Sequence, residues 1–331
     1  MDLTTRYLGL ALKNPLVAGA GPLNGELDNL RRLEDAGAGA VVLPSIFEEQ
    51  IENEQEAVER LSVTGTDSYA EALTYFPASA SYRIGPERYL KVIDRAAKAV
   101  AIPVVASLNG MSEHGWVNYA RHIQEAGASA LELNIYFIPA DLRLTGREVE
   151  QRYVDIMTAV KKAVTIPVAV KLGPYFSSVG HTATELDRAG ADGLVLFNRF
   201  YQPDIDLSRL MMAPNLELSS PHEIRLPLLW IGLLSGRIKA SLAASSGVES
   251  ADEVVKYLLA GADVVMTTSS LLRHGVEHMG VLLDGLRAWL AARDLETLDQ
   301  LRGRMSQRNV VDPTAFERAN YIKILQGYKA S

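Results

Sequence analysis

Four stretches of the chain share one hydrophobic pattern, in which an amphipathic helix ends at Ala-Gly and a short apolar run follows. They span residues 35–43, 125–133, 188–196 and 259–267. Glycine readily adopts the left-handed conformation that ends many helices, and a short apolar run suits a buried strand. The pattern therefore predicts four places where a helix is followed by a strand.

Four other apolar runs lie between these stretches, at residues 15–20, 102–108, 166–172 and 238–244. Two of them begin with Ile-Pro-Val, which places proline near the start of a strand, where its missing N–H donor is tolerated. Together the two sets predict eight strands, near residues 16, 41, 104, 131, 168, 194, 240 and 264.

Helical patterns separate most of these strands, at residues 23–36, 85–100, 116–126, 148–164, 181–189, 221–234 and 251–260. Eight strands that alternate with helices predict a (β/α)8 barrel, the TIM barrel. A doubly wound parallel sheet is the alternative, but it seldom contains eight evenly repeated units. Because no segment reads as a linker, we predict one domain over residues 1–331, with the barrel core at about 14–290.

Two regions exceed what a minimal barrel requires. Residues 47–82 form a long insertion after the second strand, and its first part is acidic. An insertion there is expected to lie over the mouth of the barrel as a lid or binding loop. Residues 294–331 form a C-terminal helical extension, which reads as two further helices.

Composition limits the possible partners. The formal net charge of −7 argues against nucleic acid. The absence of cysteine excludes disulfides, thiolate metal sites and a cysteine nucleophile, and no other metal site is predicted. The N-terminus lacks the pattern of a signal peptide, and no apolar run reaches the ~20 residues that a membrane span needs. We expect a cytoplasmic protein that acts on a small molecule, without a membrane or nucleic-acid partner.

Catalytic residues of such barrels lie at the carboxyl ends of the strands and in the loops that follow. The candidates there are Gly19, Ala20, Gly21, Ser45, Asn109, Asn134, Tyr136, Lys171, Asn198, Ser246, Gly247, Thr268 and Ser269. A lysine among three asparagines suits a planar heterocycle that is bound through hydrogen bonds. Plainer explanations also exist, because a lysine can extend from a strand end into solvent and asparagine often forms turns.

The last two strand ends carry small polar residues, Ser246 with Gly247 and Thr268 with Ser269. Small residues let backbone N–H groups approach an anion, and the loops after strands seven and eight are the usual phosphate site of this fold. Ser250 also begins a predicted capping box, which explains part of the same polar stretch. We interpret the two loops as a phosphate site.

Several short motifs occur in order along the chain: Asn-Pro-Leu-Val-Ala-Gly-Ala-Gly at 14–21, Asn-Gly-Met-Ser at 109–112, Glu-Leu-Asn at 132–134, Val-Lys-Leu-Gly-Pro-Tyr at 170–175, Asn198, Ser-Gly-Val-Glu at 246–249 and Thr-Thr-Ser at 267–269. By these motifs the chain resembles the dihydroorotate dehydrogenase family, which are FMN-binding (β/α)8 barrels, from Asn14 to about Gly275. The resemblance implies FMN as cofactor, a homodimer, and oxidation of dihydroorotate to orotate in pyrimidine biosynthesis.

The resemblance also implies roles for the strand-end residues. The flavin contacts that it implies come from Gly19, Ala20, Gly21, Ser45, Asn109 and Asn198, and the phosphate contacts from Ser246, Gly247, Thr268 and Ser269. Asn134 would contact both flavin and substrate. Lys171 would lie near the flavin N1 and C2 carbonyl, where a fixed positive charge stabilises the anionic reduced ring.

Four positions depart from the family pattern. The second lysine that is usual after the second strand is replaced by Pro44, and the Cys or Ser that removes the substrate proton is replaced by Phe137. A substrate-contacting asparagine is replaced by Pro139, and Arg199 stands where the family has a small residue. Because phenylalanine cannot accept a proton, we expect a substrate other than dihydroorotate.

Tyr136 adjoins the replaced base and is a candidate proton donor to a reduced product, although a loop aromatic can also serve only for packing. Two other functions stay open at this point. One is a Schiff-base lyase or aldolase that uses Lys171, since a lysine in a barrel can form an imine with a carbonyl substrate. The other is a flavin-binding protein without turnover, which the replaced base suggests.

Overall fold

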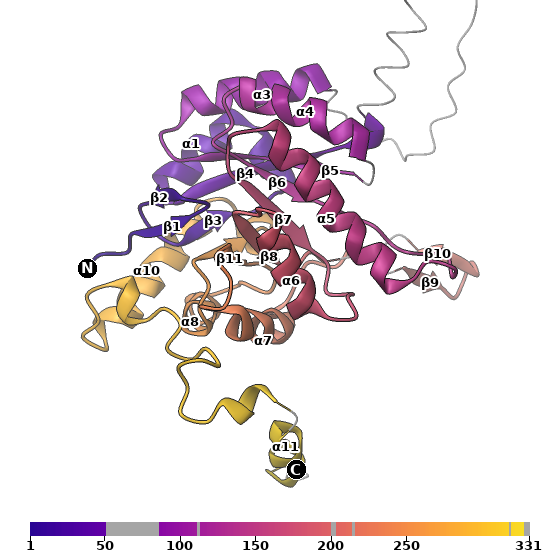
Figure 1. Cartoon of the computed structure of the whole chain (residues 1–331). Coiled ribbons are helices and arrows are strands. Elements are labelled where there is room, and N and C mark those ends of the chain that lie inside the picture. Colours follow the sequence, from indigo (N-terminus) through magenta and orange to yellow (C-terminus); the bar gives the residue numbers. More distant parts are fainter. Residues whose placement is uncertain (51–85, 111–112, 200–202, 214–215, 318, 328–331) are drawn as a thin grey trace, which may run out of the picture.

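The computed structural model describes residues 1–50, 86–110, 113–199, 203–213, 216–317 and 319–327. Within them, eight parallel strands close into a barrel (Figure 1). The strands are β3 (Leu16–Ala18), β4 (Ala40–Phe47), β5 (Val104–Asn109), β6 (Ala130–Asn134), β7 (Val168–Leu172), β8 (Gly193–Leu196), β11 (Ser241–Ala244) and β12 (Val264–Thr267). They follow one another around the barrel in chain order. The predicted TIM barrel and its eight strands are confirmed.

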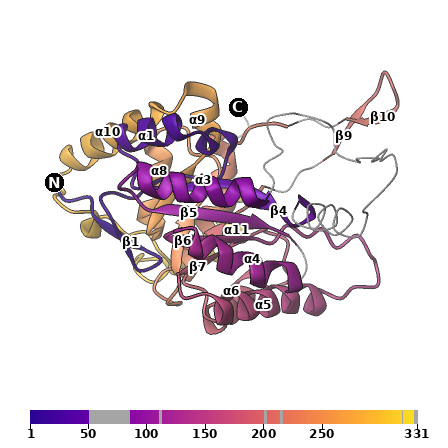
Figure 2. The ribbon, with the colours of Figure 1, turned by 90° about the horizontal axis from the view of Figure 1, so that it is seen from above.

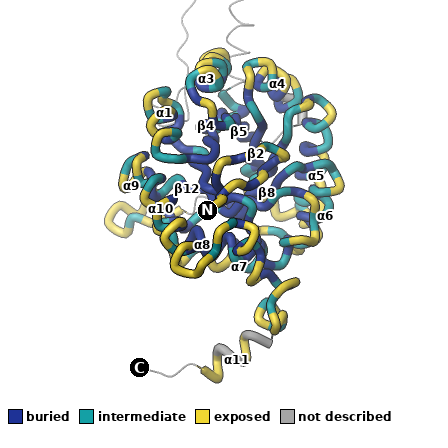
Figure 3. The backbone as a smooth tube through the Cα atoms, turned by 90° about the vertical axis from the view of Figure 1, so that its left-hand side faces the viewer, coloured by how far each residue is buried: buried dark blue, intermediate teal, exposed yellow. Residues whose placement is uncertain are grey.

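Helices surround the barrel, and their outer faces carry most of the exposed residues while the strands are buried at the centre (Figure 3). They are α1 (Leu27–Asp35), α3 (Pro86–Ala99), α4 (Glu113–Glu125), α5 (Gly146–Ala163), α6 (Val179–Arg188), α7 (Arg225–Leu234), α8 (Ala251–Ala260), α9 (Ser269–His274) and α10 (His278–Ala291). The glycines predicted to end four of these helices have φ between +95° and +116°, as that role requires: Gly37, Gly127, Gly190 and Gly261.

The sequence of α5 shows why such a segment forms a helix on this surface. Its N-cap, Thr145, makes a capping box with Glu148, which satisfies backbone N–H groups at the helix start. Its buried side chains recur at spacings of three and four residues: Tyr153, Ile156, Met157 and Val160. That spacing gives one apolar stripe, which packs against the outer, equally apolar face of the barrel.

The inside of the barrel is lined mostly by small apolar side chains. They are Val17, Ala40, Val42, Val105, Ala130, Ala169, Val195, Ala243, Val264 and Met266. An antiparallel hairpin of β1 (Thr5–Tyr7) and β2 (Leu10–Leu12) fills the space that they leave at the amino end. Its Tyr7, Leu8 and Leu12 are each at most 2% exposed. The sequence patterns did not predict this hairpin.

Two further segments extend beyond the barrel. A second hairpin, β9 (Asp204–Asp206) with β10 (Met211–Ala213), projects from the loop after β8 (Figures 1 and 2). The C-terminal extension holds η3 (Leu298–Gln300), η4 (Pro313–Phe316) and α11 (Ala319–Gly327), of which the first two are short 3-10 turns. The described part of this extension therefore contains one α-helix, where the sequence suggested two.

The predicted insertion at residues 47–82 lies almost entirely outside the described residues, since only its first four are described. Two short 3-10 turns, η1 (Pro22–Gly25) and η2 (Pro221–Ile224), precede α1 and α7. Among the described helices, none combines the length and the apolar character that crossing a membrane would need.

Candidate active site

Strand register brings three of the predicted residues to one level at the carboxyl end of the barrel. Asn109 of β5 is paired with Asn134 of β6, which is paired with Lys171 of β7. Asn198, directly after β8, donates a hydrogen bond from Nδ2 to the Asn134 Oδ1 at 2.8 Å. Three amides and one ammonium group therefore share one side of the barrel mouth.

Lys171 does not extend into solvent. Its side chain is 12% exposed, and its Nζ lies 3.6 Å from Oε1 of Glu132, whose side chain is 1% exposed. Glu132 precedes Asn134 by two residues on β6, so it faces the same way one level deeper in the barrel. This contact excludes the plainer explanation of Lys171 as a solvated strand end. In the sequence, Glu132 stands out only as part of a motif.

Ser45 is held by a second polar pair at the level of Glu132. Its Oγ lies 2.7 Å from the Oγ of Ser107, and Ser107 is paired with Glu132 in the strand register. Tyr89 of α3 fixes the same place from outside, because its hydroxyl donates to the Ser107 carbonyl at 3.1 Å. Burial raises the pKa of Tyr89, so this hydroxyl stays protonated.

The loop after β3 leaves no room for side chains at two of its glycines. A Cβ on Gly19 would lie 2.7 Å from Oγ1 of Thr268, and one on Gly21 would lie 2.5 Å from Cγ2 of the same residue. Asn24 holds the loop in place by donating to the carbonyls of Gly19 at 2.9 Å and Val42 at 2.7 Å. The backbone of residues 19–21 therefore packs directly against the loop after β12.

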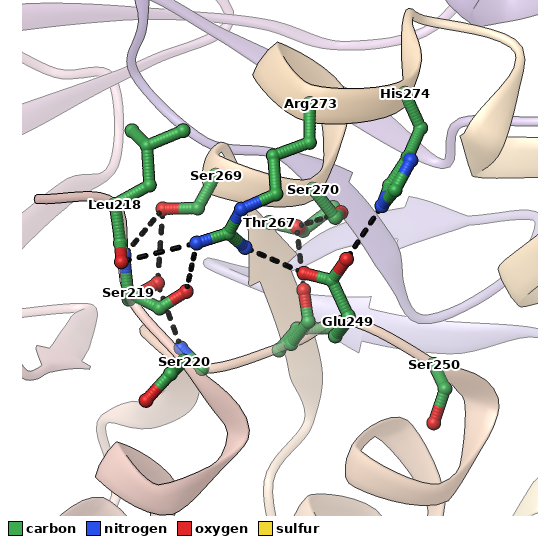
Figure 4. A network of polar contacts seen from close by, with 12 residues as sticks. Leu218, Ser219, Ser220, Glu249, Ser250, Thr267, Ser269, Ser270, Arg273 and His274 are labelled. Carbon is green, nitrogen blue, oxygen red and sulfur yellow. Dashed lines mark hydrogen bonds and ion pairs between the residues drawn. The ribbon is translucent and has the colours of Figure 1, made fainter.

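The two loops predicted to hold a phosphate are joined by Ser219, which sequence reasoning missed (Figure 4). Gly247, with φ of +73°, donates its N–H to the Ser219 Oγ at 3.1 Å. The Ser219 hydroxyl in turn donates to the Oγ of Ser269 at 2.9 Å. The N–H of Gly247 and the hydroxyl of Ser269 are both predicted to bind an anion. In this structure each of them contacts the hydroxyl oxygen of Ser219.

Arg273 of α9 fastens these loops from outside (Figure 4). It donates to the Ser219 carbonyl at 2.9 Å and to the Glu249 carboxylate at 2.6 Å. His274 contacts the other carboxylate oxygen at 2.5 Å. Burial opposes the charged form of Glu249, but the hydrogen bonds from His274 and Arg273 outweigh it and lower its pKa below the ordinary 4.5. We call Ser219, Glu249, Arg273 and His274 the loop clamp.

The predicted capping box after this loop is confirmed. The Ser250 hydroxyl accepts a hydrogen bond from the N–H of Asp252, and the Glu253 carboxylate accepts from the N–H of Ser250. The box begins α8, so the loop after β11 passes directly into a helix. Part of the polar sequence is therefore explained by helix capping, as expected.

A cavity of about 680 Å³ opens beside Asn198 and Ser246. Tyr136 lines it, and Arg199 and Glu223 form an ion pair at 2.8 Å within its wall. Phe137 is not among its lining residues. The Phe137 ring lies instead under the guanidinium group of Arg152 of α5, with 4.1 Å from Cζ to the ring centre. Of these two neighbouring aromatic residues, Tyr136 is thus the one that faces a ligand-sized space.

The family of the chain follows from its sequence. Residues 2–290 match the model of the family described as dihydroorotate dehydrogenase. This chain belongs to the dihydroorotate dehydrogenase family. The expected resemblance to this family is therefore confirmed.

Relatives from several organisms match nearly the whole chain. A protein of Aeropyrum pernix, provisionally named dihydroorotate dehydrogenase A (fumarate), is 27% identical over 91% of this chain and 97% of its own length. The catalytic subunit of dihydroorotate dehydrogenase B (NAD(+)) of Methanothermobacter thermautotrophicus is 25% identical over the same shares. The NAD-dependent dihydropyrimidine dehydrogenase subunit PreA of Escherichia coli is 23% identical over 97% of this chain and 80% of its own. These relatives are oxidoreductases.

Proposed function

We propose that this protein is an FMN-dependent oxidoreductase that acts on a small, planar ring compound other than dihydroorotate. The observation that carries the proposal is the group of Asn109, Asn134, Lys171 and Asn198 at one side of the barrel mouth, in a chain of the dihydroorotate dehydrogenase family. Amides and a lysine offer both hydrogen-bond donors and acceptors to a flat heterocycle.

The residues present fit an FMN molecule. A flat ring can lie along a backbone that carries no large side chain, and the loop of Gly19, Ala20 and Gly21 is such a backbone. Glycine is required at positions 19 and 21 because a Cβ at either would collide with Thr268. Residues 19–21 with Ser45 would lie along the ring, and the loops that carry Gly247 and Ser269 would hold the phosphate. Bound there, FMN would supply hydride transfer.

A phosphate bound by these loops would have to interact with Ser219 or displace it. Its hydroxyl accepts from the N–H of Gly247 and contacts Ser269, which are two groups that an anion would use. A phosphate group would therefore either replace Ser219 as their partner or accept a hydrogen bond from its hydroxyl. In both cases Ser219 belongs to the anion site, together with Ser246 and Thr268.

We propose Tyr136 as the proton donor to the product and Asn134 as the group that orients the substrate. Tyr136 lines the 680 Å³ cavity next to Asn198, whereas Phe137 packs under Arg152 and has no acidic proton to donate. Replacement of Tyr136 by Phe should lower the rate of substrate reduction by about 10²- to 10⁴-fold, the usual contribution of general acid catalysis. The affinity for FMN should change little.

The names of the relatives support the choice of substrate class. One is named for dihydroorotate and another for dihydropyrimidine dehydrogenation, and both names denote reduced pyrimidine rings. The substrate of this chain would be a ring of similar size. Phe137, Pro139 and Arg199 stand where the family pattern has dihydroorotate-contacting or small residues, so the ring would differ in its substituents.

The experiment that tests the proposal is visible absorbance of protein purified without refolding, followed by anaerobic titration. A flavin spectrum, or its appearance after addition of FMN, is expected. Dihydroorotate should leave that spectrum oxidised. A protein that binds no FMN would end the proposal, and a bound flavin that no donor or acceptor changes would favour the flavin-binding protein without turnover. Borohydride trapping of Lys171 with candidate ketones would instead reveal an aldolase or lyase.

A further inference from the structure

Glu132 lies in the barrel wall, at a place where an ionisable side chain requires an explanation. Its side chain is 1% exposed, and neither carboxylate oxygen accepts a hydrogen bond from the residues that the structure describes. It stands between Ser107 of β5 and Ala169 of β7 in the strand register. Burial of a carboxylate whose oxygens lack hydrogen bonds is strongly unfavourable. Stability of the fold therefore does not account for this residue.

Lys171 is the cation that Glu132 faces. The distance of 3.6 Å between Lys171 Nζ and Glu132 Oε1 is too long for a hydrogen bond but short enough for a strong electrostatic attraction away from water. Lys171 is level with Asn134, so the carboxylate lies on the inner side of the ammonium group, below the amides of the mouth.

Three other polar side chains of the described residues near Glu132 are uncharged: Ser107, Tyr7 and Tyr89. The Ser107 hydroxyl is engaged with Ser45. The pKa values of Tyr7 of β1 and Tyr89 of α3 are both raised. Burial is the main cause for each phenol, and the charge of Glu132 adds to it. Both tyrosines therefore stay protonated, and the charge of Glu132 acts on Lys171.

We propose that Glu132 is a positioning residue for Lys171. Its carboxylate keeps the lysine side chain inside the mouth, at the level of Asn109 and Asn134, and opposes the lysine charge at the same place. One consequence rests on the proposed function. An FMN bound in this mouth would lie beside the ion pair of Lys171 and Glu132 instead of a lone lysine charge. The reduced, anionic flavin would then be stabilised less than by an unpaired lysine.

The first test uses the protein without flavin. Lys171 is acylated with acetic anhydride over a series of pH values, and its labelling is followed by peptide mass spectrometry. In the wild type, the Glu132 carboxylate holds the Lys171 amine inside the barrel mouth, 3.6 Å away. In Glu132→Gln the lysine side chain should be released toward solvent, so Lys171 should be acylated faster than in the wild type at the same pH. Asp263→Asn, which changes a partly buried acid paired with Arg302, is the control and should leave the labelling of Lys171 unchanged. Identical labelling profiles for wild type and E132Q would overturn the proposal.

The second test measures the reduction potential of bound FMN. E132Q should favour reduced over oxidised FMN by about tenfold, which corresponds to a rise of ~30 mV for a two-electron couple. In the Lys171→Met background the same substitution should have no effect, because Glu132 acts through the lysine. An equal rise in both backgrounds would contradict the proposal, as would no rise at all.

The two tests separate this inference from the function on which it partly rests. If wild-type protein binds no FMN, the proposed function fails, while the acylation profile still decides whether Glu132 acts on Lys171. A role of Glu132 in stability alone would change the melting temperature of E132Q in both backgrounds. It would change neither the labelling profile nor the potential.

Discussion

At the mouth of the barrel, single residues decide how closely the backbone segments approach one another. Gly247 has a positive φ of +73°, and a Cβ there would lie 2.7 Å from Ile224 Cγ2 and 2.8 Å from the Ser220 carbonyl oxygen. Because one of these atoms belongs to the backbone, a larger residue would have to move the loop that carries Ser219.

Gly247→Ala should therefore lower the free energy of unfolding by about 1–3 kcal/mol. It should also weaken FMN binding, because the N–H of residue 247 would shift. Urea unfolding and a flavin titration measure the two effects. Gly327→Ala is the matched control, since no atom lies within 4 Å of the added carbon. Equal behaviour of the two variants would contradict the proposed close approach at Gly247.

Phe137 shows that the direction of a side chain matters as much as its chemistry. Its ring lies under Arg152 of α5, whereas Tyr136 lines the cavity. Phe137→Cys would place a thiol where the family resemblance puts the proton-abstracting base, but the thiol would replace a ring that packs toward α5. We expect no bleaching of the flavin by dihydroorotate in anaerobic mixing of this variant. Rapid bleaching would show that one residue alone separates this chain from dihydroorotate oxidation.

At the scale of elements, the loop clamp joins three segments: the one that carries Ser219, the loop after β11 and α9. Its carboxylate makes this contact sensitive to acid. The pKa of Glu249 is lowered in the folded protein, so its charged form stabilises the fold above the ordinary 4.5. This contribution is lost as the pH falls below 4.5 and through the lowered value. It comes from a partly exposed group that joins α9 to the loop after β11.

Glu249→Gln should therefore make stability less dependent on pH below about 4.5. Urea unfolding at neutral and acidic pH measures the slope. Glu277→Gln is the control, because the pKa of this exposed acid is also lowered, by its backbone hydrogen bond and by Arg32. Both variants should lose part of the acid sensitivity, but only E249Q should weaken FMN binding. Loss of FMN affinity in E277Q as well would argue against a local role of the clamp.

At the scale of the whole molecule, the β9–β10 hairpin presents an apolar surface to solvent. Six large apolar side chains between residues 205 and 216 are 56–84% exposed: Ile205, Leu207, Leu210, Met211, Met212 and Leu216. Apolar patches of this kind on a protein surface mark contact sites. We propose that the hairpin contributes to the homodimer that the family resemblance implies.

Replacement of Leu207 and Leu210 together by Lys should weaken the dimer at least about tenfold, since two buried leucines contribute more than 1.4 kcal/mol. Sedimentation velocity over a range of concentrations measures the effect. Leu142→Lys is the control, because Leu142 is 98% exposed in another loop. A monomeric wild type, or a double variant that dimerises normally, would contradict the proposal.

The sequence predicted the barrel because the alternation of apolar strands and amphipathic helices is a local property. All four Ala-Gly pairs end helices with a glycine at positive φ, and Ser250 begins α8 as expected. The β1–β2 hairpin escaped prediction, because its three-residue strands carry too short a pattern. Its place is set by the space that small side chains leave inside the barrel.

The site was predictable only where the strands themselves position it. Asn109, Asn134 and Lys171 come together because each ends a parallel strand. The part played by Ser219 could not be inferred, since its partners Gly247 and Ser269 lie 28 and 50 residues away. The environment of Glu132 was equally hidden, because a sequence does not show which charges are buried. The roles of these residues toward FMN stay predictions.

The β1–β2 hairpin, which fills the amino end of the barrel, affects the order in which reactants would bind. Tyr7, Leu8 and Leu12 fill that end, so within the part of the chain that the structure describes, reactants would approach the site from the mouth. The electron donor and the electron acceptor would then bind one after the other at the same mouth. Steady-state kinetics should therefore be of the ping-pong type, with parallel lines in double-reciprocal plots. Intersecting lines would point to a second point of access to the flavin.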